Sequence, residues 1–182
     1  MSLMIGKNSL AAALIVVLAG CTALPFLSKA PHETAPAAPV APKLDLRMSV
    51  FIALPDDGGS ASLRYIGSGK AVSHAVAGAF SKHGVPVYLS GARMTEDDAI
   101  EAATRLKAGY AVLPVITWWD QRNKWLGFPS RLAIRIAIID VATGRVIASK
   151  PIESHTLLAS FSTPDPDSLL AGPLSKYVDT LY

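Results

Sequence analysis

The chain has 182 residues, of which 51% are hydrophobic and 17% charged, and its formal net charge is +3 at pH 7. This length favours one domain with a substantial core. No cluster of Lys and Arg stands out, which argues against a nucleic-acid-binding protein. The single cysteine, Cys21, excludes a disulfide within the chain.

The first 20 residues have the pattern of a secretory signal. Lys7 supplies a positive charge, and ten apolar residues follow at positions 10–19. This run is too short to cross a bilayer core as a helix, which needs about 20 residues. Its length instead fits the hydrophobic region of a signal peptide. We therefore expect a signal peptide over residues 1–20.

The end of this segment reads Leu18-Ala19-Gly20-Cys21, which resembles the lipobox of bacterial lipoproteins. In that family the cysteine thiol is diacylated, the chain is cut before it, and the new N-terminus is acylated. The resemblance implies a lipid on Cys21 that attaches the mature protein to a membrane. Thr22 at the next position implies the outer membrane, with the domain facing the periplasm. An ordinary signal peptide with a chance cysteine and an uncleaved membrane anchor are the alternatives.

A proline-rich segment follows the cysteine. Residues 22–43 carry five prolines among Ala, Ser and Thr. Such a segment cannot bury enough apolar surface to fold, and its prolines keep it extended. We expect residues 21–43 to be a lipidated tether and residues 44–182 to be the folded domain.

Hydrophobic periodicity predicts the elements of this domain. A strand at 46–54 ends in the turn sequence Pro55-Asp56-Asp57-Gly58-Gly59, and a helix follows at 68–83 with Gly84 at its end. The remaining elements are a strand at 85–89, a helix at 95–107 with Thr95 and Asp98 as a capping box, strands at 110–119, 131–140 and 145–154, and a helix that begins after Gly172-Pro173.

The order of these elements is β-α-β-α-β-β-β-α. The alternating start favours parallel strands joined by helices, and the later strands favour an antiparallel meander. The strand at 110–119 is apolar on both faces, which indicates a central position, and Pro114 within it indicates a bulge or a locally unpaired edge. We expect a single α/β domain with a five-stranded mixed sheet and helices packed on it.

The residues show no pattern that argues for catalysis. Gly67-Ser68-Gly69-Lys70 precedes a helix but lacks the spacing of a phosphate-binding loop, so we expect Ser68 to cap the helix. His74 and His83 are nine residues apart, which places them on opposite faces of one helix. We expect no enzyme activity, no metal and no other cofactor.

The most unusual segment is 118–128, which holds all three tryptophans, Trp118, Trp119 and Trp125, together with Phe128. Adjacent strand residues face opposite ways. Trp118 follows Val112 and Ile116 in the alternation, so it is predicted to enter the core, and Trp119 and Trp125 are predicted to be exposed. The interaction candidates are therefore Trp119, Arg122, Trp125 and Phe128. The cluster could also simply brace the hairpin or contact a membrane.

The domain resembles an uncharacterised family of proteobacterial lipoproteins that is known only as a domain of unknown function. The matching features are Gly67-Ser68-Gly69-Lys70, Trp119-Asp120, Trp125, Gly127, Pro129, Thr143-Gly144, Leu169-Leu170, Tyr177-Val178 and Leu181-Tyr182. The strand order and the turn at 140–144 are similar to the periplasmic lipoprotein domains of the curli secretion channel, of LpoB, of the TolB N-terminus and of Pel polysaccharide export. That resemblance implies a domain that binds or assembles with envelope proteins.

Two functions remain open at this point. The first is a non-enzymatic outer-membrane lipoprotein whose domain docks on envelope proteins, with a homo-oligomer as a further possibility. The second is a module that binds a glycan or another small ligand, with the tryptophans as a stacking platform. The sequence predicts no nucleic-acid partner.

Overall fold

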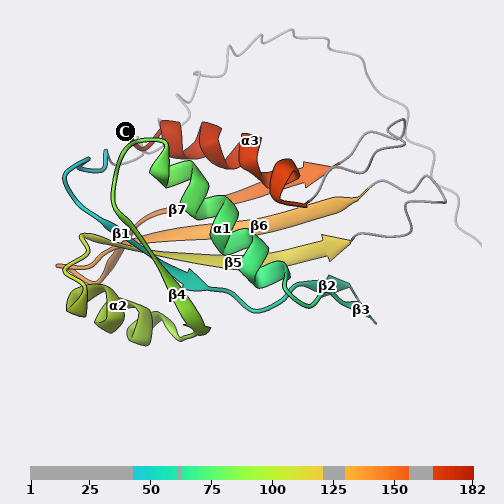
Figure 1. Cartoon of the computed structure of the whole chain (residues 1–182), viewed down its shortest axis with the longest axis horizontal. Coiled ribbons are helices and arrows are strands. Elements are labelled where there is room, and N and C mark those ends of the chain that lie inside the picture. The colour runs from blue at the N-terminus through green and yellow to red at the C-terminus, as the bar shows by residue number, and fades with distance from the viewer. Residues whose placement is uncertain (1–42, 61–62, 121–129, 156–165) are drawn as a thin grey trace, which may run out of the picture. The chain divides into compact units, whose positions relative to one another are not determined.

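A five-stranded sheet forms the centre of the domain in a computed structural model of the chain (Figure 1). The structure describes residues 43–60, 63–120, 130–155 and 166–182. The strand order is β4-β1-β5-β6-β7, and β5 lies in the middle, as its apolar faces predicted. Cys21, Arg122, Trp125 and Phe128 lie outside the described residues.

The elements follow the predicted order, with one addition. In chain order they are β1 (Val50–Leu54), β2 (Gly59–Ser60), β3 (Leu63–Arg64), α1 (Ser68–Ser81), β4 (Val87–Arg93), α2 (Glu96–Arg105), β5 (Tyr110–Asp120), β6 (Arg131–Asp140), β7 (Arg145–His155) and α3 (Pro166–Asp179). The short β2–β3 hairpin was not predicted, because two-residue strands leave no periodic signal.

The pairing agrees with the predicted mixed sheet. β1 pairs in parallel with both β4 and β5, whereas β5, β6 and β7 form an antiparallel meander. β1 pairs with β5 only as far as Val112, so Pro114 lies beyond that pairing and needs no backbone N–H on that side. This agrees with the predicted locally unpaired edge.

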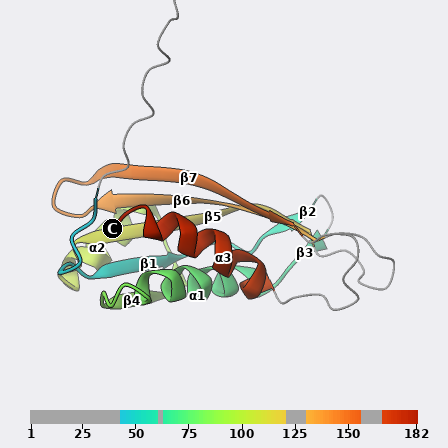
Figure 2. The ribbon, with the colours of Figure 1, turned by 90° about the horizontal axis from the view of Figure 1, so that it is seen from above.

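The two faces of the sheet carry two separate cores. Helices α1 and α3 contact each other and cover one face (Figures 1 and 2). The main core lies beneath them and includes Ile52 and Val112, together with Ile134, Ile136 and Ile138 of β6. Helix α2 covers part of the other face, where Ala99 and Ala103 pack against Phe51, Ala53 and Ala111.

Local signals set the ends of the helices. Thr95 accepts a hydrogen bond from the backbone of Asp98, and Asp98 accepts one from the backbone of Thr95, so the predicted capping box is present. Hydrogen bonds from the Thr95 side chain and backbone lower the pKa of Asp98. Gly84 follows α1 with φ of 74°, a left-handed conformation that suits glycine.

Two helix boundaries differ from the predictions. Gly67 is the N-cap residue of α1, and Ser68 lies inside the helix with its hydroxyl oxygen accepting a hydrogen bond from Gly58 N at 2.8 Å. The expectation that Ser68 caps the helix was therefore wrong. Helix α3 begins at Pro166 and contains Pro173, so it starts before the predicted position.

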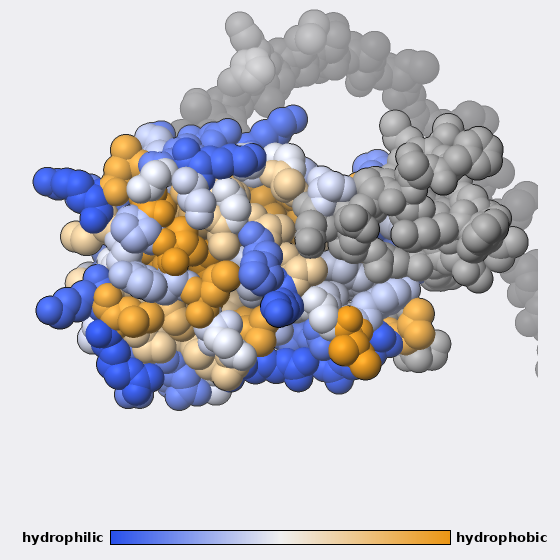
Figure 3. All heavy atoms as spheres, viewed as in Figure 1, coloured by the Kyte–Doolittle hydropathy of each residue, from blue (hydrophilic) through white to orange (hydrophobic). Residues whose placement is uncertain are grey.

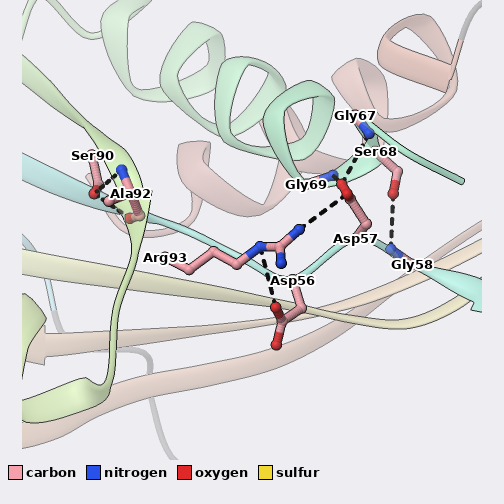
Figure 4. A network of polar contacts seen from close by, with 9 residues as sticks. All are labelled: Asp56, Asp57, Gly58, Gly67, Ser68, Gly69, Ser90, Ala92 and Arg93. Atoms are coloured by element: carbon pink, nitrogen blue, oxygen red, sulfur yellow. Dashed lines mark hydrogen bonds and ion pairs between the residues drawn. The ribbon is translucent and has the colours of Figure 1, made fainter. Parts of the chain in front are cut away.

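A carboxylate takes the place of a side-chain cap at the start of α1. The Asp57 carboxylate accepts hydrogen bonds from Gly67 N at 3.1 Å and Gly69 N at 2.9 Å, and it also pairs with Arg93 (Figure 4). An acidic group is favourable at the positive end of a helix dipole. Because Asp57 already occupies this position, the start of α1 is not an open anion site.

The turn before α1 requires glycine. A Cβ at Gly58 would lie 2.5 Å from Ile116 Cγ2 and 2.7 Å from Trp119 Cβ. Both Ile116 and Trp119 belong to β5. Because Trp119 is fully buried, the strand cannot shift to make room for the added Cβ. The Asp57–Gly58 turn is therefore fitted directly against the central strand.

We predict that Gly58→Ala lowers the free energy of unfolding by about 1–3 kcal/mol, because the added methyl overpacks this contact. Gly78→Ala is the matched control, since a Cβ at this helical glycine meets nothing within 4 Å. The control should be neutral or stabilising by about 0.5–1 kcal/mol. Urea unfolding of both variants checks this, and equal stabilities would contradict the close fit.

Candidate interaction face

An irregularity in β5 decides which tryptophan is exposed. Ile116 pairs with Ile134 on β6, but Trp118 pairs with Ala133, so Thr117 is an extra residue in the ladder. Such a β-bulge shifts the alternation of side chains by one position. Trp119, and not Trp118, therefore follows Val112 and Ile116 onto the core face.

Burial reverses the predicted roles of the two tryptophans. The Trp119 side chain is 1% exposed and belongs to the main core, whereas Trp118 is 42% exposed. The expectation that Trp118 is structural and Trp119 available was wrong, because strict alternation does not count the inserted Thr117. Trp119 is thus a core residue and offers no indole ring to a partner. Trp118 replaces it as the interaction candidate.

Trp118 lies on the face of the sheet opposite α1 and α3. On this face α2 packs mainly on β1 and β5, and Ile139 of β6 joins the same cluster. Figure 3 views the domain from the side of α1 and α3, so this surface faces away from the viewer. We call it the open face and define it by the exposed residues of β5, β6 and β7 that share it: Val115, Trp118, Arg131, Arg135, Val146, Ser149, Pro151, Glu153 and His155.

The register of the strands brings apolar and charged groups of the open face together. Val115 and Pro151 are the two cross-strand neighbours of Arg135. Trp118 lies across from Ala133, which lies across from Glu153. Glu153 also pairs with Arg131 at 3.3 Å. The Arg135 side chain has no hydrogen bond or ion pair with other described residues, so its guanidinium can donate to a partner.

The combination of residues on the open face is typical of a binding surface. Tryptophan and arginine are enriched among residues that dominate the energy of protein interfaces. Val115 is 43% exposed and Val146 is 51% exposed, so apolar side chains extend along the face. The solvent-facing side of an antiparallel sheet is normally lined by polar residues. The open face differs, because several of its exposed residues are apolar.

A second feature lies on the other side of β5. A solvent-open hollow of about 510 Å³ is lined by Arg64, Tyr65, Ile66, Gly67, Ser68, Ala71 and Trp119. The buried Trp119 Nε1 has no hydrogen-bond partner. A buried N–H group without an acceptor is uncommon.

The described part of the chain gives little support to metal binding or to a membrane-spanning helix. Residues 43–60, 63–120, 130–155 and 166–182 contain no group of three or more His, Cys, Asp or Glu side chains arranged to hold a metal. They also contain no helix that is long and apolar enough to span a membrane. His83 pairs with Asp179 at 2.9 Å and stacks on the Tyr182 ring, so it has a structural role.

A family model covers residues 42–181 and is described as a domain of unknown function, DUF4823. The chain belongs to this family. No protein of curated function matches the sequence. The family membership agrees with the resemblance noted from the sequence, and it brings no activity with it.

Solved structures share the fold of this DUF4823 chain. The PelC dodecamer from Paraburkholderia phytofirmans has a TM-score of 0.62 at 16% identity, covering 78% of this chain and 91% of that one. Lipoprotein GNA1162 from Neisseria meningitidis has a TM-score of 0.52 at 12% identity, covering 74% and 97%. The LpoB C-terminal domain from Salmonella enterica reaches only 0.39 at 16% identity, covering 59% and 82%. At their identities, the likeness to PelC and GNA1162 shows the fold alone.

We predict losses of stability of very different size for the two adjacent tryptophans. Trp119→Ala should lower the free energy of unfolding by about 3–5 kcal/mol, because it removes a buried aromatic side chain. Trp118→Ala should cost about 1 kcal/mol or less, because the ring is half in water. Chemical unfolding of both variants measures the difference. A larger loss at Trp118 would mean that the strand keeps regular alternation.

Proposed function

We propose that this chain is a non-enzymatic envelope lipoprotein whose domain docks on another envelope protein through the open face. The observation that carries the proposal is the half-exposed Trp118, which shares with Arg135 a sheet surface that α2 leaves uncovered. The lipobox at Cys21 and the fold shared with a named lipoprotein support the location in a bacterial envelope. The location in the outer membrane rests on Thr22.

The tether would allow the domain to search for its partner. Residues 22–43 are rich in proline, and an extended proline-rich chain spans about 3 Å per residue. Anchoring confines the domain to a thin layer near the membrane, which raises its effective concentration toward partners there. A moderate contact through the open face is then sufficient. The dodecameric state of PelC makes a second copy of the chain one candidate partner.

Binding of a glycan or another small ligand is the second candidate. The hollow beside the unpartnered Trp119 Nε1 favours it. The Trp119 ring itself is buried, so it would donate a hydrogen bond and would not stack on a sugar. Titration with cell-wall fragments should change tryptophan fluorescence if this function is correct, and Ile66→Ala at the hollow should reduce that change.

The lipid anchor is tested at Cys21. We predict that Cys21→Ser leaves the domain folded and releases it from the membrane, since it removes the thiol that would carry the lipid. Fractionation after salt and carbonate washes measures the release, with wild type as the membrane-bound control. A variant that stays with the membrane through both washes would contradict lipid anchoring.

The open face is tested at Trp118. We predict that Trp118→Ala weakens binding to a crosslinked envelope partner by about 2 kcal/mol, the loss expected for an interface tryptophan. Ile66→Ala is the matched control, because Ile66 is 92% exposed and lies outside the open face. Binding is measured with the purified partner. If Ile66→Ala weakens binding and Trp118→Ala does not, the docking surface is at the hollow.

A further inference from the structure

The two edge strands of the sheet, β4 and β7, differ in how they are protected against pairing with another chain. An edge strand exposes unpaired backbone groups, and native proteins block such a strand with charges, prolines or bulges. β7 carries Lys150, Pro151 and Glu153 near its middle. β4 has no charge and no proline from Val87 to Ala92. The β7 edge is therefore blocked, whereas the β4 edge is open to another strand.

The register with β1 shows which backbone groups of β4 are free. Val50 donates its N–H to Pro86 O at 2.9 Å and lies across from Val87. In a parallel pair, alternate residues of each strand direct their backbone groups at the neighbouring strand. Pro86 and Tyr88 therefore face β1, whereas the N–H and C=O groups of Val87 and Leu89 point away from the sheet. We call Val87, Tyr88 and Leu89 the β4 edge.

The side chains of the β4 edge are exposed on both faces of the sheet. Tyr88 is 39% exposed and Leu89 is 41% exposed. They lie on opposite faces, because Tyr88 lies across from Phe51 of the α2 cluster and Leu89 lies across from Ile52 of the main core. A strand added at this edge therefore gains backbone hydrogen bonds and also covers apolar surface on both faces.

The free part of β4 is short, which fixes the register of an added strand. Pro86 at its start has no N–H to donate. Towards its end a bulge interrupts the pairing with β1, and the Ser90 hydroxyl bonds both the N–H and the C=O of Ala92 (Figure 4). The free donors and acceptors thus lie in the β4 edge, on either side of Tyr88.

A second copy of the β4 edge fits these groups. When two identical strands pair antiparallel about a two-fold axis at Tyr88, Val87 of one copy lies across from Leu89 of the other, and their free backbone groups exchange hydrogen bonds. Tyr88 then lies across from its own copy, and aromatic cross-strand pairs stabilise a sheet. Like charges do not meet, because residues 87–92 are uncharged and Arg93 is paired within its own chain.

We propose that two copies of this chain join their β4 edges in antiparallel, which makes one continuous sheet with five strands from each copy. The two-fold axis is perpendicular to this sheet, so both open faces lie on one side of the dimer. This contact goes beyond the proposed function, since it leaves the open face free and gives the docking unit two of them. Anchoring on a common membrane raises the effective concentration of one copy toward another.

A cysteine on the two-fold axis tests the contact in the envelope. Opposed Cα atoms at a non-hydrogen-bonded antiparallel position are about 4.5 Å apart, which is within the range of a disulfide. Tyr88→Cys in the full lipidated chain should therefore give a crosslinked dimer when intact envelopes are oxidised with diamide. Ile66→Cys is the control, because Ile66 is 92% exposed and lies outside β4. It should give only the background of random collisions.

Charges at the same position test the symmetry of the contact. Tyr88→Lys and Tyr88→Glu each place like charges across from each other, so each variant alone should self-associate at least about tenfold more weakly than wild type. An equimolar mixture should recover the association, because opposite charges then face each other, and this recovery excludes misfolding as the cause of the loss. Sedimentation of the full lipidated chain in excess detergent micelles measures the association.

The control for the charge variants is Val146→Lys, which changes an exposed apolar residue on β7 at the other edge of the sheet. It should self-associate like wild type, because it lies outside the β4 edge. Loss of association in Val146→Lys, with wild-type association in both Tyr88 variants, would place self-association on the open face and overturn the proposal.

Three further results would overturn the proposal. The first is a Tyr88→Cys chain that crosslinks no more than Ile66→Cys. The second is a mixture of the two charge variants that does not recover. The third is a crosslink from Tyr88→Cys to a different envelope protein and not to a second copy, which would make that protein the partner of the β4 edge. The test of the open face at Trp118 is independent of all three.

Discussion

The extra residue in β5 is the constraint on which the core and the candidate site both depend. Thr117 interrupts the ladder between β5 and β6, so the strand presents Trp119 to the main core and Trp118 to the open face. Without the bulge, alternation would place Trp118 in the core and leave Trp119 on the other side. One inserted residue thus decides which indole stabilises the fold and which is available to a partner.

The buried Trp119 in turn connects the sheet to the turn before α1. Gly58 approaches its Cβ so closely that no side chain fits, and the Gly58 N–H donates to Ser68 Oγ. Next to it, Asp57 accepts two backbone hydrogen bonds at the start of α1 and pairs with Arg93 of β4 (Figure 4). The turn therefore joins β1, α1, β4 and β5, and it places a carboxylate at the positive end of the α1 dipole.

Most of the fold could be predicted from the sequence, because it depends on local periodicity and capping. The alternation of Leu132, Ile134, Ile136 and Ile138 marks β6 and its buried face, and Thr95 with Asp98 marks the start of α2. The candidate site could not be predicted, because it depends on pairing between strands. The sequence around Thr117 does not show that β6 offers it no pairing partner. Asp57 likewise lies ten residues before Gly67, the N-cap residue of the helix that it caps. The open face exists because α2 is too small to cover the whole sheet. This depends on the lengths and pairing of several strands together, so no single segment of the sequence predicts it.

The most direct measurement is hydroxyl-radical footprinting of the tryptophans in the purified protein and in intact envelopes. The account predicts that Trp118 is oxidised readily in the purified protein and protected in the envelope, because a partner then covers the open face. Trp119 should be protected in both states, since it lies in the core. Equal oxidation of Trp118 in both states would contradict a docking role for the open face. Greater reactivity of Trp119 than of Trp118 would contradict the bulge itself.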